Sequence, residues 1–123
     1  MRQNDRVRAS GHSKIPTYDF VAPLWEWDAK AGWFFVTVPV EISDEIAART
    51  DGFTKGFGSV KVRVRIGGSE WSTSLFPDSK QQAYVLPIKK AVRLAESLDP
   101  GADATVHLEL AEPADLAELA ELP

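Results

Sequence analysis

Hydrophobic and polar residues alternate along several short stretches of the chain, most clearly in Val60–Ile66. Valine or isoleucine occupies every second position there, and lysine or arginine fills the positions between. A period of two predicts a strand with one buried face and one solvent face. Gly67-Gly68 then predicts a tight turn that needs positive φ, and Trp71–Phe76 the returning strand. The pattern therefore predicts a β-hairpin in the middle of the chain.

Similar patterns predict further strands on both sides of this hairpin. Their predicted bounds are Tyr18–Trp27, Trp33–Val38, Ala83–Leu86 and Thr105–Leu110. Pro23 interrupts the first of these strands, so we expect an edge or a bulge at that point. Strands this close together, without the long crossovers of a parallel sheet, favour a mainly β fold.

Two helices are predicted between the strands. The first follows Pro39, with Ser43 as its start and Asp51-Gly52 as its end, and is expected to be short. The second, Pro87–Leu98, is expected to be the better helix. Its predicted apolar side consists of Ile88, Val92, Leu94 and Ala95.

A strand–proline–helix–strand pattern occurs twice, 48 positions apart. Val38-Pro39-Val40 begins the first copy and Leu86-Pro87-Ile88 the second. We interpret the repeat as two half-barrels in one chain. The predicted fold is a small antiparallel double-split β-barrel of about six strands and two short helices, with a pseudo-two-fold axis.

The length of 123 residues and the 44 % of hydrophobic residues allow one domain with a sizeable core. We expect that domain at residues 17–111. Residues 1–16 carry four basic side chains and one acid, so they are predicted to form a disordered basic tail. Residues 112–123 are predicted to be an acidic tail or a short helix.

Composition removes several classes of function. The absence of cysteine excludes disulfides, thiolate zinc sites and thiol nucleophiles. No apolar stretch reaches the roughly 18 residues that a membrane helix needs, and no secretory signal pattern is present. We therefore expect a cytoplasmic monomer that does not interact with membranes and needs no cofactor or metal.

A set of short motifs, taken in order, carries a family resemblance: Gly32-Trp33, Val38-Pro39, Gly56–Val60, Gly67 with Trp71–Leu75, and Leu86–Arg93. The segment Tyr84–Arg93 with Asp99-Pro100-Gly101 resembles the swapped-hairpin unit of AbrB-like transcription regulators. The stretch from about Tyr18 to Leu110 more closely resembles an uncharacterised bacterial family, domain of unknown function nineteen-oh-five. The resemblance implies a double-split barrel in which one chain supplies both halves. It brings no established activity.

The best candidate binding site is the cluster Lys89, Lys90 and Arg93. Lys89 and Arg93 are four residues apart and share one face of the predicted helix, and Lys90 lies beside them near its start. Such a cluster could bind a phosphate or carboxylate group, on a small anionic molecule or on a protein partner. The alternative is a solvated helix face. The four tryptophans could likewise stack on a flat ligand or pack in the core.

The alternative binding site is the cationic stripe Lys61, Arg63 and Arg65, which could contact nucleic-acid phosphates. Symmetric DNA recognition is disfavoured, because Glu41 and Glu45 of the first repeat align with Lys89 and Arg93 of the second.

Signals of catalysis are nearly absent. His12 and His107 have no evident partners, and no acids are spaced for acid–base work. We expect a non-catalytic binding module with no catalytic residues.

Overall fold

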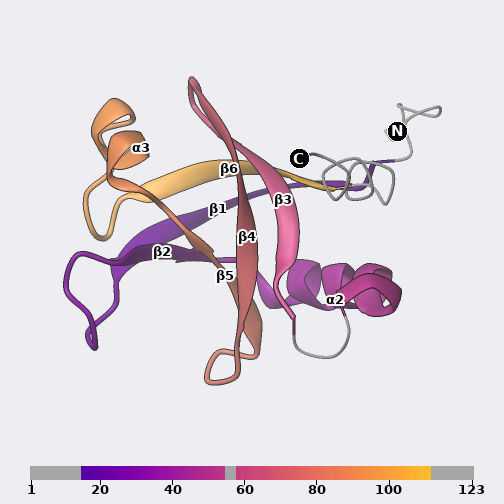
Figure 1. Ribbon diagram of the computed structural model, residues 1–123. Helices are drawn as coiled ribbons and strands as arrows, with labels where there is room; N and C mark the ends of the chain where they lie inside the picture. Colours follow the sequence, from indigo (N-terminus) through magenta and orange to yellow (C-terminus); the bar gives the residue numbers. More distant parts are fainter. Residues whose placement is uncertain (1–14, 55–57, 112–123) are drawn as a thin grey trace, which may run out of the picture.

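The computed structural model of the protein describes residues 15–54 and 58–111, and these residues form a closed barrel (Figure 1). Around the barrel the strands follow the order β1, β2, β5, β4, β3, β6, and β6 pairs with β1 again. All six pairings are antiparallel. The elements along the chain are β1 (Thr17–Glu26), β2 (Phe34–Thr37), α2 (Val40–Thr54), β3 (Val60–Ile66), β4 (Ser69–Asp78), β5 (Ala83–Pro87), α3 (Lys90–Ala95) and β6 (Asp103–Leu110). The predicted small antiparallel barrel is confirmed.

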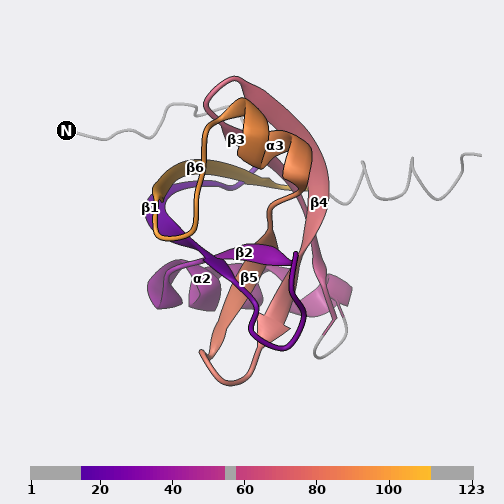
Figure 2. The ribbon, with the colours of Figure 1, turned by 90° about the vertical axis from the view of Figure 1, so that its left-hand side faces the viewer.

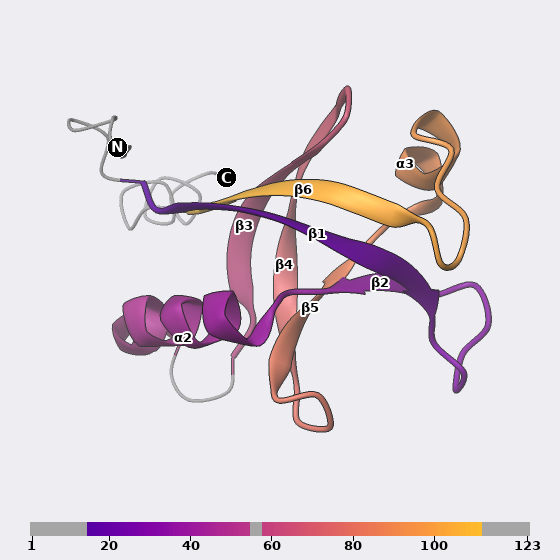
Figure 3. The same cartoon turned by 180° about the vertical axis from the view of Figure 1, so that it is seen from behind.

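The strand order is unchanged when the two halves of the described chain are exchanged. Replacing β1 by β4, β2 by β5 and β3 by β6 reproduces the same set of neighbours. The two helices occupy the corresponding places, α2 between β2 and β3 and α3 between β5 and β6. They lie at opposite ends of the barrel, as Figures 1 and 3 show. The twofold pattern expected from the repeat is therefore present in the topology.

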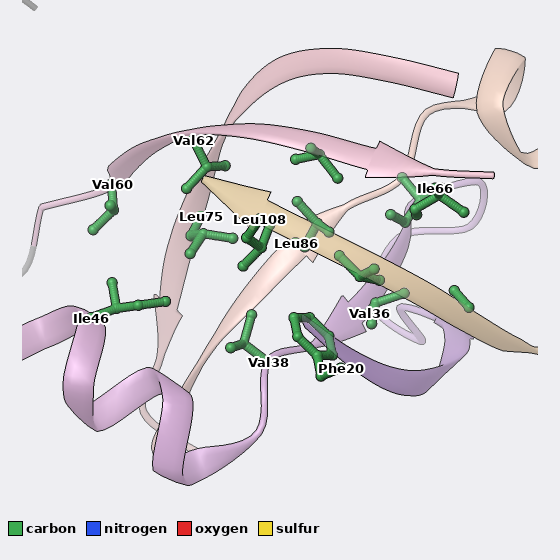
Figure 4. Packing of buried hydrophobic residues seen from close by; sticks show 14 of the residues in the cluster. Phe20, Val36, Val38, Ile46, Val60, Val62, Ile66, Leu75, Leu86 and Leu108 are labelled. Atoms are coloured by element: carbon green, nitrogen blue, oxygen red, sulfur yellow. The ribbon is translucent and has the colours of Figure 1, made fainter. Parts of the chain in front are cut away.

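The core fills the inside of the barrel and is entirely apolar in its centre. β3 shows how the alternation in the sequence becomes structure, because its valines and isoleucine are buried and its cations are exposed. Val36 of β2 lies opposite Leu86 of β5, and both are fully buried. Figure 4 shows these side chains converging with those of the other strands and with Ile46 of α2. Burial of each such side chain contributes about 1.5–3 kcal/mol.

β1 is long enough to pair with two different strands in succession. Its first part pairs with β6 as far as Pro23 opposite Asp103, and pairing with β2 begins at Leu24 opposite Val36. Pro23 therefore lies at the junction of two pairings, paired with β6 on one side and not with β2 on the other, which agrees with the expected edge position. At the other end of β1, the Leu110 amide donates a hydrogen bond to the Pro16 carbonyl at 3.0 Å. The chain thus enters and leaves the barrel at the same place.

The first helix is longer than predicted and begins earlier. α2 spans 15 residues from Val40 instead of starting at Ser43. Ser43 is buried inside α2, where its hydroxyl donates to the Val38 carbonyl at 3.1 Å and accepts from the Tyr84 amide at 3.0 Å. A serine before acidic residues resembled a helix cap, but here it joins the helix to β5 and to Val38, the residue directly after β2.

The second helix is shorter than predicted. α3 has six residues, because Pro87 remains in β5 opposite Phe35 and Ser97 has a positive φ of 55°. Ile88 and Val92 are buried as expected, but Leu94 is 70 % exposed and Ala95 is exposed as well, so the assignment of these two to the apolar side was wrong. Leu94 lies two residues after Val92, which places it on the opposite side of the helix.

The predicted tails lie almost wholly outside the described residues, which exclude 1–14 and 112–123. Within the described part of the chain, neither helix is both long and apolar enough to cross a membrane.

Leu86→Ala should lower the free energy of unfolding by about 2–5 kcal/mol, because it leaves a cavity in the centre of the barrel. Leu94→Ala removes the same atoms from an exposed position and should change the free energy of unfolding by less than about 0.5 kcal/mol. Urea unfolding followed by tryptophan fluorescence measures both. Equal losses for the two variants would contradict this description of the core.

Ser43→Ala should cost about 1–3 kcal/mol of stability, because the Val38 carbonyl and the Tyr84 amide both lose a buried partner. Ser59→Ala provides the control, because Ser59 is exposed. Hydrogen exchange of the Tyr84 amide should accelerate in the first variant alone.

Candidate functional site

A groove at the α3 end of the barrel brings the three predicted binding residues together. It lies between the beginning of β2, the beginning of β4 and the segment that leads into α3, and its volume is about 630 Å³. Lys89 directly precedes α3, Lys90 begins it and Arg93 lies in its last turn. We call this hollow the cationic groove. Figure 2 views the molecule from the end at which α3 lies.

Aromatic rings support two of these cations. The Lys89 Nζ lies 5.9 Å from the centre of the Trp71 ring. The Arg93 guanidinium carbon lies 3.9 Å from the centre of the Phe34 ring, and its Nε donates to the Ile88 carbonyl at 3.3 Å. Each cation–π contact contributes about 0.5–2 kcal/mol. The contacts fix the Arg93 side chain and leave its terminal nitrogens available to a ligand.

The positive charge of the groove is not compensated locally. Among residues 15–54 and 58–111, the ion pairs that form involve Arg49, Arg65 and His107, and none involves Lys89, Lys90 or Arg93. The six residues of α3 are too few for a strong helix dipole. Any attraction for an anion therefore comes from the side chains and not from the helix start that the sequence suggested.

Glu96, the acid nearest to these cations in sequence, is engaged elsewhere. Its carboxylate accepts a hydrogen bond from the Ser69 hydroxyl at 2.7 Å. It also packs against Gly67 in the β3–β4 turn, where φ is +57°. This contact ties the end of α3 to the turn and keeps the carboxylate of Glu96 on Ser69.

A second hollow, of about 470 Å³, lies on the outer face of the barrel around the β1–β2 and β4–β5 hairpins. Its aromatic members are Trp25, Trp27, Trp33, Phe35 and Phe76, and we call it the aromatic patch. The Phe35 ring lies 5.2 Å from that of Trp25, 6.3 Å from that of Trp27 and 6.4 Å from that of Trp33, centre to centre. The sequence left open whether the tryptophans pack or stack on a ligand. Here Trp27 and Trp33 are 44 % and 47 % exposed.

Polar contacts hold one side of the aromatic patch in place. The Trp25 indole N–H donates to the Thr37 hydroxyl at 2.9 Å, and that hydroxyl donates to the Gln81 side-chain oxygen at 2.8 Å. The Gln81 amide donates to Asp78 at 2.8 Å. This hydrogen bond is the main reason why the pKa of Asp78 is lowered, so Asp78 is ionised at neutral pH.

The alternative stripe Lys61, Arg63 and Arg65 lies on the solvent face of β3 and lines no part of the cationic groove. Arg63 and Arg65 line a neighbouring hollow, which shares Trp71 and Ser72 with the groove. Arg65 forms a 3.7 Å ion pair with Glu70, and Arg63 lies opposite Glu109 in β6. Acidic side chains therefore flank this stripe, in contrast to the cationic groove.

His107 has partners that the sequence did not reveal. Its Nδ1 lies 2.7 Å from an Asp19 carboxylate oxygen and its Nε2 lies 3.5 Å from one of Glu109. Asp19 is opposite His107 in the β1–β6 register, so only the strand pairing discloses the contact. The expectation that His107 lacks a partner was wrong; His12 lies outside the described residues.

No group of three potential metal ligands occurs in the part of the chain that the structure describes.

The profile of one known family, a domain of unknown function (DUF1905), matches residues 20–108. The chain belongs to this family. The match covers all six strands at least in part and both helices, and thus includes the cationic groove and the aromatic patch. No curated protein matches the chain. The match to DUF1905 therefore covers most of the barrel and assigns no activity to its surface.

Gly67→Ala should lower stability by about 1–2 kcal/mol, because the methyl group would overlap the Glu96 carboxylate and the backbone has positive φ. Gly68→Ala is the matched control, since nothing lies near its added methyl group. Chemical denaturation gives the difference between them. Similar stabilities of the two variants would contradict the described contact between the turn and α3.

Proposed function

We propose that this DUF1905 barrel is a non-catalytic binding module whose cationic groove takes an anionic group, from a small molecule or a protein partner. One observation carries the proposal: Lys89, Lys90 and Arg93 surround one hollow and form no ion pair with any described carboxylate. A protein rarely gathers like charges without compensation, because their repulsion lowers stability.

The aromatic walls strengthen the attraction for an anion. Trp71 and Phe34 line the groove beside Lys89 and Arg93, where Arg93 is half-buried and Lys89 is exposed. Two opposite charges 4 Å apart attract by about 1 kcal/mol in water but by about 4 kcal/mol near a protein surface of lower dielectric constant. The guanidinium also offers parallel N–H donors that suit carboxylate and phosphate oxygens. Carboxylates and phosphates are therefore the proposed ligand groups.

The proposal includes the expectation that the module acts in the cytoplasm as a monomer, without metal or cofactor. Nucleic-acid binding through Lys61, Arg63 and Arg65 is less well supported, because Glu70 and Glu109 lie beside that stripe.

We expect benzoate and phosphate to shift the amide signals of residues 88–93 and the Trp71 indole signal when the ¹⁵N-labelled full chain is titrated. Benzoate should bind more tightly, because its ring can pack on the aromatic walls. Lys89→Gln with Arg93→Gln should weaken binding by about tenfold or more, which corresponds to about 1.4 kcal/mol.

The matched control is Lys61→Gln with Arg63→Gln, which removes the same charge from the outer face of β3. Equal weakening by both double variants would show nonspecific attraction and would refute the site. Binding of a short DNA duplex at low salt, lost only in the Lys61 and Arg63 variant, would support the nucleic-acid alternative.

A further inference from the structure

The cationic groove and the aromatic patch are parts of one surface, because both contain Trp33. This residue lines the groove beside Lys89 and Arg93 and also lines the patch beside Phe35. The Lys30 Nζ lies over its ring, 4.7 Å from the ring centre, but Trp33 is still 47 % exposed and its remaining surface is accessible to a ligand. A single molecule can therefore contact cations on one side of Trp33 and apolar rings on the other.

The apolar part of this surface is unusually exposed for a small barrel. Trp27, Trp33 and Phe76 are each between 44 % and 47 % exposed. Within residues 15–54 and 58–111, no helix covers the patch, because its lining comes from β1, β2, β4, β5 and the two hairpin connections. Contiguous exposed aromatic rings with a polar rim are typical of protein interaction sites.

The arrangement of the two hollows suits an elongated ligand. Each alone, at about 630 and 470 Å³, has the size of a small-molecule pocket of roughly 300–1,000 Å³, but the two adjoin at Trp33, so a ligand that occupies both must extend from one to the other. Both are open to solvent. An extended peptide, which advances about 3.3 Å per residue, can place successive side chains in the two hollows.

The barrel itself restricts how such a peptide can bind. β-sheet addition requires a free strand edge. Every strand here has two neighbours, although some stretches, such as residues 69–75 of β4 with β3, pair on one side alone. We therefore assign recognition to side chains in the hollows, as in the aromatic grooves that bind proline-rich segments. Charge complementarity with Lys89, Lys90 and Arg93 then requires at least one acidic side chain in the segment.

We infer that the cationic groove and the aromatic patch together bind an extended peptide segment of a protein partner. An aspartate or glutamate of the segment occupies the groove, and neighbouring leucine, phenylalanine or proline side chains pack on the patch. The inference rests on the proposed function, since it identifies the carrier of the anionic group. It adds Trp27 and Phe76 as specificity-determining residues.

An anionic membrane surface fits the same residues less well. Asp78 and Lys80 both line the patch, so their opposite charges offer anionic lipid headgroups no net attraction there. The patch is also a hollow, which suits inserted side chains better than a flat bilayer.

A random peptide library displayed on phage, selected on the immobilised full chain, tests the inference. The selected sequences should contain an acidic residue within a few positions of two or more apolar residues. Failure to enrich any sequence, or enrichment without acids, would overturn the inference.

The strongest selected peptide is then synthesised and its affinity is measured by fluorescence anisotropy. Two double variants should each weaken binding by about tenfold or more. The first combines Lys89→Gln with Arg93→Gln, and the second combines Trp27→Ala with Phe76→Ala. Leu94→Ala, an exposed apolar residue outside both hollows, should leave it unchanged. Thermal unfolding of each variant confirms that the barrel is intact.

The benzoate titration separates the two proposals. If the Trp27 and Phe76 variant binds both peptide and benzoate normally, the inference fails and the proposed anion site stands. If benzoate produces no shift in the groove, the proposed function fails as well. A last outcome concerns the membrane alternative. If the chain sediments with phosphatidylserine vesicles and the Trp27 and Phe76 variant does not, the surface binds a membrane and not a peptide.

Discussion

The antiparallel pairing of β1 with β6 joins the beginning of the domain to its end over seven residue pairs, from Thr17 to Pro23. Because this pairing closes the barrel, every strand has two neighbours and all the inward side chains share one core. The outward faces and the two ends are then free to carry polar or aromatic residues without loss of core packing. The cationic groove and the aromatic patch depend on this closure, since each is built from segments that only the barrel brings together.

Much of the fold could be predicted, because strand alternation is a local property. β3 was predicted residue for residue, since its inward valines and outward cations follow the pleat. The helices were harder, and their relative lengths were predicted in the wrong order. Ser43 resembled a cap but serves buried contacts to Val38 and Tyr84, and a tertiary role of that kind leaves no signal in the neighbouring sequence.

The candidate site was predictable in its charges and not in its shape. The spacing of Lys89 and Arg93 indicated a shared helix face, and the structure places both at one groove. The rings beneath them, Trp71 and Phe34, come from strands distant in sequence, so no local pattern could pair them with these cations. The repeat did predict that the two ends of the barrel differ in charge. Glu45 occupies the position in the first copy that Arg93 occupies in the second, and at the α2 end it forms an ion pair with Arg49 at 3.3 Å. The two ends share a topology and differ in charge.

The hydrogen bond between Pro16 and Leu110 places the entry and exit of the barrel side by side. Figure 3 shows this point near the α2 end, far from α3. Both ends of the barrel domain therefore lie at the α2 end. The cationic groove lies at the other end, beside α3. Such a module can be inserted into a loop of another protein or joined in tandem without obstructing the proposed binding surface. The same geometry makes the α2 end suitable for immobilisation or labelling.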